Sequence, residues 1–353
     1  MSQKPLLSLA DDGNHSMIRR SQFVILIHIF ISQGANLDAV LEKYSFDLDD
    51  LSSIPSYVPF AVELEIMEEA WKESIDPYVV YRHSVAPDLH RYGPVYSLVQ
   101  AASTLRAGLG ALIQYENLYI TYFDIQLHII DQWAYLSFQI NNADLKPHRQ
   151  FNEFITSSYT NLIRGAAGVD WVPEEVYFSH QQPEELKPSE DFFGSPVYYG
   201  AQTNLIVFDA KTLDVAMPNS NHIIFSIAKE DLEQGINDCC RGNRFTNQVA
   251  SAILDFYHNQ EPEDPKLPIT RVAEMLHSNT KNLQRKLLAN KVSYSGLLSY
   301  CRFLLAIHYL IHTEQTVTTI SDRLGYTERS SFERAFRRST LLTPSQFRKT
   351  HCI

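Results

Sequence analysis

Hydrophobic residues recur every three or four positions over much of the chain, which is the spacing of one face of an α-helix. In the stretch 59–75, Val62, Ile66 and Ala70 follow one another at intervals of four residues. Thr104 is a candidate N-cap, because its hydroxyl can accept a hydrogen bond from the first turn of a helix. The pattern predicts helices over residues 18–33, 36–44, 59–75, 94–116 and 148–164.

The period changes to two between residues 118 and 141. Residues 118–130 are β-branched and aromatic, and Asp131-Gln132 predicts a turn. In 134–141, Leu136 and its alternate neighbours face one way, while Ser137 and its alternate neighbours face the other. We therefore expect a hairpin with one buried side. Shorter strands are expected near 175–180, 197–200 and 204–208.

The helical pattern returns over 243–258, and the stretch "HNQEPEDPKLP" then interrupts it with three prolines and three acids. Everything after this linker has a helical pattern. A chain of 353 residues also favours two domains. We predict an α+β domain over 1–235 and an all-α domain over 236–353.

The last 90 residues contain two helix-turn-helix candidates, near 269–291 and 316–338. In the first, Asn279 can cap the second helix. In the second, Gly325 can adopt the positive φ of a tight turn, and Thr327 can cap the helix that follows.

The two units share one arrangement of apolar and basic residues. The apolar pairs Leu283/Leu287 and Phe332/Phe336 lie 49 residues apart, and so do Arg285 and Arg334. On a helical wheel each arginine points away from its apolar pair. The apolar stretch 294–312 between the units predicts a linker helix about 28 Å long at ~1.5 Å per residue. Such a helix could hold two recognition helices in successive major grooves, about 34 Å apart.

The charge distribution supports a polyanionic partner for the second domain. Residues 266–353 carry 14 Lys and Arg against five Asp and Glu, a balance of +9. The remainder of the chain carries −20, so the net charge is −11. An acidic body with a basic end is typical of a protein whose end meets nucleic acid.

The run from Arg302 through Ala306 and Leu310, followed by "ISDRLGYTERSSFERAFRRSTLLTPSQFR", resembles the C-terminal domain of AraC/XylS-type transcription regulators. The resemblance covers about 110 residues. The stretch 192–218 is similar to the arabinose-binding-like sensor domain of a subgroup of that family. The expected fold class is thus an α+β N-terminal sensor domain followed by an all-α domain with two helix-turn-helix units joined by a linker helix.

The resemblance implies which residues meet DNA. Base readout falls on the exposed early positions of the recognition helices: Lys281, Asn282, Gln284 and Arg285 in the first, and Arg329, Ser330 and Arg334 in the second. Phosphate contacts are expected from Thr280, Thr327, Arg337, Arg338 and Lys349. The sequence departs from the family pattern at His277 and Lys291, where glycines are common, and at Ser339-Thr340-Leu341.

Signatures of catalysis are missing from the sequence. It contains no P-loop, no G-x-G-x-x-G and no G-x-S-x-G, so we predict no enzyme, no catalytic residues and no cofactor. His308 and His312 lie one helical turn apart, but no third ligand is evident. We expect an exposed helix face there and no metal. The four cysteines show no C-x-x-C spacing, and the apolar run 23–31 is too short to cross a bilayer, so we expect a cytoplasmic protein without membrane contact.

The predicted function is sequence-specific transcription regulation on double-stranded promoter DNA. A small-molecule effector such as an amino acid or a fatty acid is expected in the N-terminal domain. RNA polymerase is an expected partner if the protein is an activator, and a homodimer is also expected. One alternative is a ligand-independent repressor or architectural protein. The other is an enzyme in the N-terminal domain fused to a DNA-binding module.

Overall fold

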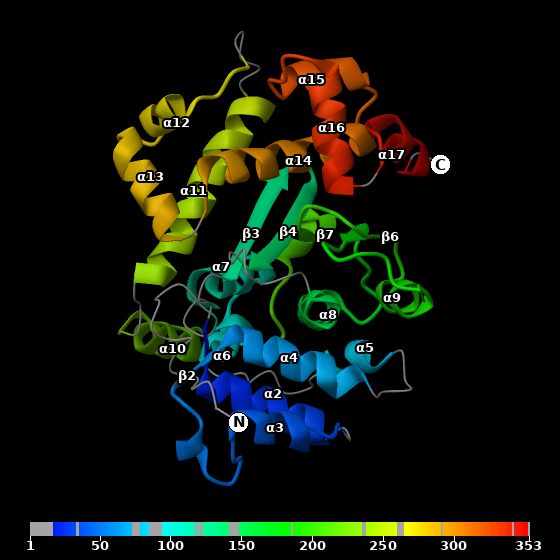
Figure 1. Cartoon of the computed structure of the whole chain (residues 1–353). Coiled ribbons are helices and arrows are strands. Elements are labelled where there is room, and N and C mark those ends of the chain that lie inside the picture. The colour runs from blue at the N-terminus through cyan, green and yellow to red at the C-terminus, as the bar shows by residue number, and fades with distance from the viewer. Residues whose placement is uncertain are drawn as a thin grey trace.

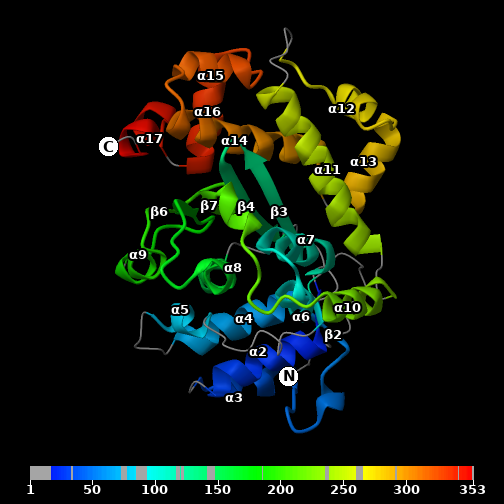
Figure 2. The ribbon, with the colours of Figure 1, turned by 180° about the vertical axis from the view of Figure 1, so that it is seen from behind.

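The computed structural model describes residues 17–32, 35–72, 78–84, 94–116, 120, 123–140, 148–184, 186–234, 238–259, 265–290, 292–340 and 342–351. Helices at the N-terminal end, a central sheet and the C-terminal helices follow one another from bottom to top in Figure 1. The reverse view in Figure 2 shows the same three levels. The sheet therefore lies between the two helical parts of the molecule.

The N-terminal level contains the helices that the apolar spacing predicts, together with one short helix, α5 (Val79–His83), that it did not predict. Strand β1 (Met17–Arg19) pairs antiparallel with β2 (Tyr57–Pro59) beside them. The expected helix 94–116 is two helices, because Thr104 begins a new one by accepting a hydrogen bond from the backbone N–H of Ala107 at 3.3 Å. The helices are α2 (Arg20–Ser32), α3 (Asp38–Tyr44), α4 (Phe60–Lys72), α5 (Val79–His83), α6 (Pro94–Ala101) and α7 (Leu105–Tyr115), with a 3₁₀ turn η1 (Leu51–Ser53).

The central sheet has five strands in the order β3-β4-β7-β5-β6. All neighbours are antiparallel except β5 and β6. Asp131 occupies the β3–β4 turn with φ 52°, a left-handed conformation that Asp adopts more readily than most residues. The strands are β3 (Phe123–Ile130), β4 (Trp133–Ile140), β5 (Glu175–Tyr177), β6 (Val197–Tyr198) and β7 (Asn204–Asp209).

Both faces of the β3–β4 hairpin are buried, so the prediction of one buried side was wrong. Leu136 and Phe138 pack into the N-terminal core as expected. The opposite face, with Tyr135 and Ser137, is covered by helices of the C-terminal part. The hydropathy pattern could not predict that this second face is buried. Its polar side chains are buried because they find hydrogen-bond partners on a distant part of the chain.

Further helices and loops surround the sheet. Besides α5, the structure adds two helices that the apolar spacing did not predict, α9 (Lys187–Phe193) and α10 (His222–Gln234). The predicted helix over 148–164 is α8 (Arg149–Ala167), and η4 (Ala210–Asp214) follows β7. Of the described residues, none forms a helix that combines the length and the apolar character needed to span a bilayer.

The described C-terminal part is all helical. The predicted boundary between 235 and 236 lies outside the described residues, and α11 (Asp238–His258) runs from the level of α10 to the top of the molecule (Figures 1 and 2). The other helices are α12 (Ile269–Met275), α13 (Thr280–Ala289), α14 (Tyr294–His312), α15 (Val317–Arg323), α16 (Arg329–Thr340) and α17 (Pro344–His351). Their core continues onto Tyr135, Leu205 and Val207 of the sheet.

Candidate nucleic-acid interface

Two helix pairs, α12–α13 and α15–α16, have the same turn geometry. The left-handed residue is His277 (φ 49°) in the first turn and Gly325 (φ 72°) in the second. The residue after each donates its backbone N–H to a carbonyl five positions earlier, from Ser278 at 2.8 Å and from Tyr326 at 3.1 Å. This 6→1 hydrogen bond ends the first helix of each pair and directs the chain into the second.

The two recognition helices begin differently. Asn279 caps α13 as predicted, because its Oδ1 accepts from the backbone N–H of Asn282 at 2.8 Å. Thr327 does not cap α16, because that helix begins at Arg329. The carbonyl of Glu328 accepts the first helical hydrogen bonds of α16 instead. The cap therefore lies one residue later than the sequence pattern predicted.

The apolar pairs predicted to anchor the recognition helices are buried. Leu283 and Leu287 of α13 are 0% and 1% exposed, and Phe332 and Phe336 of α16 are 1% and 3% exposed. Phe336 also packs edge-on against Phe347 of α17, with ring centroids 5.1 Å apart. These contacts fix the rotation of each helix about its axis, so that the opposite side faces solvent.

The structure places the predicted base-reading residues on that solvent side. In α13, Asn282 is partly exposed and the other three candidates are exposed. In α16, all three candidates are exposed, and so is Arg337, which was predicted to contact phosphate. The first set is Lys281, Asn282, Gln284 and Arg285, and the second is Arg329, Ser330 and Arg334.

Several of these side chains are held by neighbours on their own helix. Arg285 donates to Asn282 Oδ1 at 3.1 Å, and Arg334 donates to Ser331 Oγ at 3.2 Å. Arg329 pairs with Glu333, with 2.7 Å between Nε and Oε1. A DNA contact by Arg329 has to replace this ion pair, whereas Arg334 has to give up only a hydroxyl. An open hollow on α16 is lined by Tyr326, Ser331, Arg334, Ala335, Arg337 and Arg338.

Helix α14 lies between the two pairs, with α13 near one end and α16 near the other (Figures 1 and 2). Its bounds, Tyr294–His312, agree with the predicted linker helix. Ser293 caps it by accepting from the backbone N–H of Gly296 at 3.0 Å. Nineteen residues span about 28 Å at ~1.5 Å per residue.

Three arginines of the basic C-terminal part serve the fold instead of the exposed face. Arg302 donates to the Tyr257 hydroxyl at 2.9 Å and to the Gly325 carbonyl at 3.3 Å. Arg323 donates to the carbonyls of Tyr257 and His258, which closes the end of α11. Arg348 donates to three carbonyls at the end of α14. Charge counting cannot separate these residues from the exposed ones, because the distinction depends on tertiary contacts.

Comparison with known families agrees with this geometry. Residues 34–217 match the model of the arabinose-binding domain of AraC transcription regulators, N-terminal part, and residues 272–350 match a helix-turn-helix domain model. A helical domain with two helix-turn-helix units, joined to an α+β domain of this kind, defines a transcription regulator with a ligand-binding domain. The chain belongs to the AraC family of transcription regulators.

The chain is similar to named members of the family. It is 23% identical to the HTH-type transcriptional regulator VqsM of Pseudomonas aeruginosa over 325 aligned residues. The aligned region covers 88% of this chain and 95% of that protein. It is 36% identical over 102 residues to the urease operon transcriptional activator of Escherichia coli, covering 29% and 33%. Among solved structures, the regulator CdpR from Pseudomonas aeruginosa matches with a TM-score of 0.42 and 17% identity over 91% of this chain and 98% of that one.

Proposed function

We propose that α13 and α16 read base pairs in two successive major grooves of promoter DNA. The observation that carries this proposal is the pair of matched helices, each anchored by a buried apolar pair and each with exposed basic side chains on the opposite side. Arg285 and Arg334 are assigned to guanine, because arginine pairs with guanine O6 and N7 through two hydrogen bonds. Gln284 can pair with adenine in the same way.

The phosphate contacts of the proposal come from the exposed Arg337, Arg338 and Lys349, together with Thr280 and Thr327. These contacts set the position of the protein on the duplex and carry no sequence information. Affinity should therefore fall with salt, with a log–log slope of about −0.9 for each phosphate neutralised.

A matched pair of variants on one helix tests this division of roles. The operator is first identified by sequencing the genomic DNA fragments that the protein retains. Arg334→Ala should then cost about 1–3 kcal/mol on the operator and relax the preference at one base pair. Arg338→Ala should weaken binding to operator and random DNA alike. If Arg334→Ala also weakens both DNAs equally, Arg334 contacts phosphate and the assignment is wrong.

For the effector we propose a cavity in the N-terminal domain. A cavity of about 170 Å³ lies between α4, β4, α8 and β7. Its amide and hydroxyl groups suit a small polar molecule. Pockets for drug-sized ligands typically have volumes of about 300–1,000 Å³, so this cavity is smaller than they are. An amino acid fits this site better than a fatty acid does. The lining residues are Leu64, Phe138, Gln139, Ile140, His148, Phe151, Asn152, Ser179, Gln202, Thr203 and Asn204.

One residue of this cavity also touches the second recognition helix. Gln202 Oε1 accepts a hydrogen bond from Ser339 Oγ of α16 at 3.3 Å. A ligand that recruits the Gln202 amide weakens this bond, and the equilibrium between arrangements of α16 changes accordingly. Coupling of this kind is typically about 1–3 kcal/mol, or 5–150-fold in affinity.

The effector proposal is tested by thermal-shift screening of amino acids, fatty acids and sugars, followed by DNA affinity with and without any ligand found. The ligand should raise the melting temperature and change DNA affinity. Ser339→Ala should keep the thermal shift and reduce the change in DNA affinity, whereas the exposed Ser345→Ala should alter neither. If every compound leaves the melting temperature unchanged, or if a bound ligand leaves DNA affinity and transcription unchanged, the protein is a ligand-independent regulator.

The remaining parts of the proposal concern where the protein acts, which proteins it contacts and whether it catalyses a reaction. The protein works in the cytoplasm, contacts RNA polymerase if it activates, and pairs as a homodimer on two-fold sites. It performs no turnover, in agreement with the missing catalytic motifs of the sequence. If the protein regulates transcription from its promoter while its ligand stays chemically unchanged, the enzyme alternative is excluded.

A further inference from the structure

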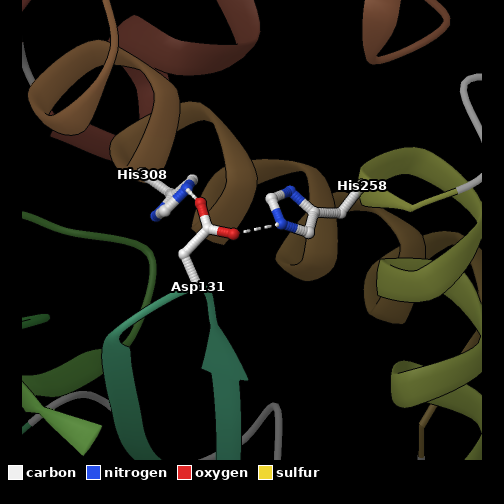
Figure 3. A group of neighbouring side chains, drawn as sticks. All are labelled: Asp131, His258 and His308. Atoms are coloured by element: carbon white, nitrogen blue, oxygen red, sulfur yellow. Dashed lines mark hydrogen bonds and ion pairs between the residues drawn. The ribbon is translucent and has the colours of Figure 1, made fainter.

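Three side chains from separate parts of the chain meet where the sheet joins the C-terminal helices. Asp131 lies in the β3–β4 turn, His258 is the last residue of α11, and His308 lies in α14, four residues before that helix ends (Figure 3). Asp131 Oδ1 lies 3.1 Å from His258 Nε2, and Asp131 Oδ2 lies 3.0 Å from His308 Nε2. His308 is 1% exposed, so the expectation of an exposed helix face at this residue was wrong.

The three groups have the donor chemistry of a transition-metal site. Two imidazole nitrogens and one carboxylate oxygen form a set that occurs at Zn²⁺ sites, where a fourth position holds water or another ligand. The three ligand atoms lie within 4.8 Å of one another. A tetrahedral Zn²⁺ with bonds of about 2.0–2.1 Å separates its ligand atoms by about 3.4 Å. Small side-chain adjustments therefore suffice to admit the ion.

Each histidine has a second partner that fixes its ring. His308 Nδ1 hydrogen-bonds the Tyr135 hydroxyl at 3.0 Å, and His258 Nδ1 hydrogen-bonds the Tyr309 hydroxyl at 2.9 Å. Both rings thereby direct Nε2 toward Asp131, as Figure 3 shows for His258. A tyrosine hydroxyl can donate to Nδ1 or accept from it, so it tolerates the tautomer with a bare Nε2 that metal binding needs.

The site is also open to solvent. The side chain of Asp131 is 58% exposed, whereas those of His258 and His308 are 17% and 1% exposed. An ion can thus arrive on the carboxylate side and then bind the two imidazoles. The left-handed turn that holds Asp131 places the carboxylate beside the two helices.

We propose that Asp131, His258 and His308 bind one divalent transition-metal ion of the Zn²⁺ class. The ion joins the β3–β4 turn of the sensor domain to α11 and to the linker helix. Bound metal therefore stabilises one arrangement of the two domains relative to each other. His312, the residue that sequence spacing pairs with His308, is outside the set and stacks on Trp133 at 4.5 Å.

Metal titration of the full chain tests the proposal. After treatment with a chelator, the protein is titrated with Zn²⁺ by calorimetry and with Co²⁺ by its visible absorption, which reports coordination geometry. The wild type should bind one equivalent of each ion and unfold at a higher temperature with Zn²⁺. Asp131→Asn and His258→Gln should each weaken binding at least about 100-fold, and Tyr309→Phe about ten-fold.

Controls separate ligation from general effects on folding. His222→Gln removes an exposed histidine elsewhere and should bind metal like the wild type. Asparagine is well suited to the left-handed φ of residue 131, so Asp131→Asn should keep its thermal unfolding in chelator close to that of the wild type. The proposal is overturned if the wild type binds no stoichiometric ion, or if Asp131→Asn and His258→Gln bind as tightly as His222→Gln.

Discussion

At the scale of single residues, the two helix-turn-helix units form the same left-handed turn with different residues. Gly325 has φ 72°, and a Cβ there would lie 2.3 Å from the Pro265 carbonyl oxygen. His277 has φ 49° at the equivalent position and keeps its side chain exposed. The sequence departure at His277 therefore places local strain in the first unit, since left-handed φ is costly for residues other than glycine.

His277→Gly should relieve that strain and raise the free energy of unfolding by about 0.5–1 kcal/mol, part of the relief being offset by the flexibility of glycine in the unfolded chain. The reciprocal change, Gly325→Ala, should lower the free energy of unfolding by at least about 2 kcal/mol. The added Cβ both strains the left-handed backbone and clashes with the Pro265 carbonyl oxygen. Urea denaturation measures both changes. Loss of stability in His277→Gly would show that the histidine is held by contacts that outweigh its strain.

At the scale of elements, α14 organises the DNA-binding part. Its N-terminus is capped by Ser293, and its last carbonyls accept from the Arg348 guanidinium at 3.0–3.4 Å. A cation at this end also interacts favourably with the helix dipole. Arg348 therefore belongs to the fold, although it lies in the same basic segment as the exposed Arg337 and Arg338.

Arg348→Gln should lower the free energy of unfolding by about 1–2 kcal/mol, because the carbonyls of α14 lose a charged donor. Its operator affinity, measured well below the unfolding midpoint, should stay within about two-fold of the wild type, since the residue faces α14 and not DNA. A large loss of specific binding with unchanged stability would instead assign Arg348 to DNA.

Period and spacing predicted α4, α13 and α16 and the exposed side of each recognition helix, and the apolar run 294–312 predicted α14, which is buried on nearly all sides. The predicted cap at Thr104 is confirmed, because its hydroxyl accepts a hydrogen bond from the backbone N–H of Ala107. The same reasoning missed the Asp131, His258 and His308 cluster. These residues lie up to 177 positions apart, and only tertiary contacts bring them together.

At the scale of the whole molecule, a polar face of the sheet meets the C-terminal helices. Asp124, Gln126 and His128 form a hydrogen-bonded row along β3, and Ser137 Oγ lies 2.5 Å from the Tyr300 hydroxyl of α14. An interface between domains that is rich in polar side chains resembles a transient protein–protein interface. Interfaces of this kind open and close more readily than apolar cores do. This interface is suited to transmit a change in the sensor domain to the linker helix.

The titration of His128 gives a prediction for this interface. Burial lowers its pKa from 6.5 to about 4. Between these values the unfolded chain binds more protons than the folded one, so stability is lost as pH falls from 6.5 towards 4. His128→Gln should lose less stability over that range, whereas His222→Gln, an exposed site, should follow the wild type. Parallel curves of unfolding free energy against pH for all three proteins would contradict the prediction.

The two-groove arrangement is tested most directly by guanine methylation protection on the operator. The wild type should protect guanines in two clusters about one helical turn, ~10 base pairs, apart on one face of the duplex. Arg285→Ala should remove protection from one cluster and Arg334→Ala from the other, with the remaining cluster retained. A single protected cluster, or loss of both clusters with either variant, would contradict the arrangement.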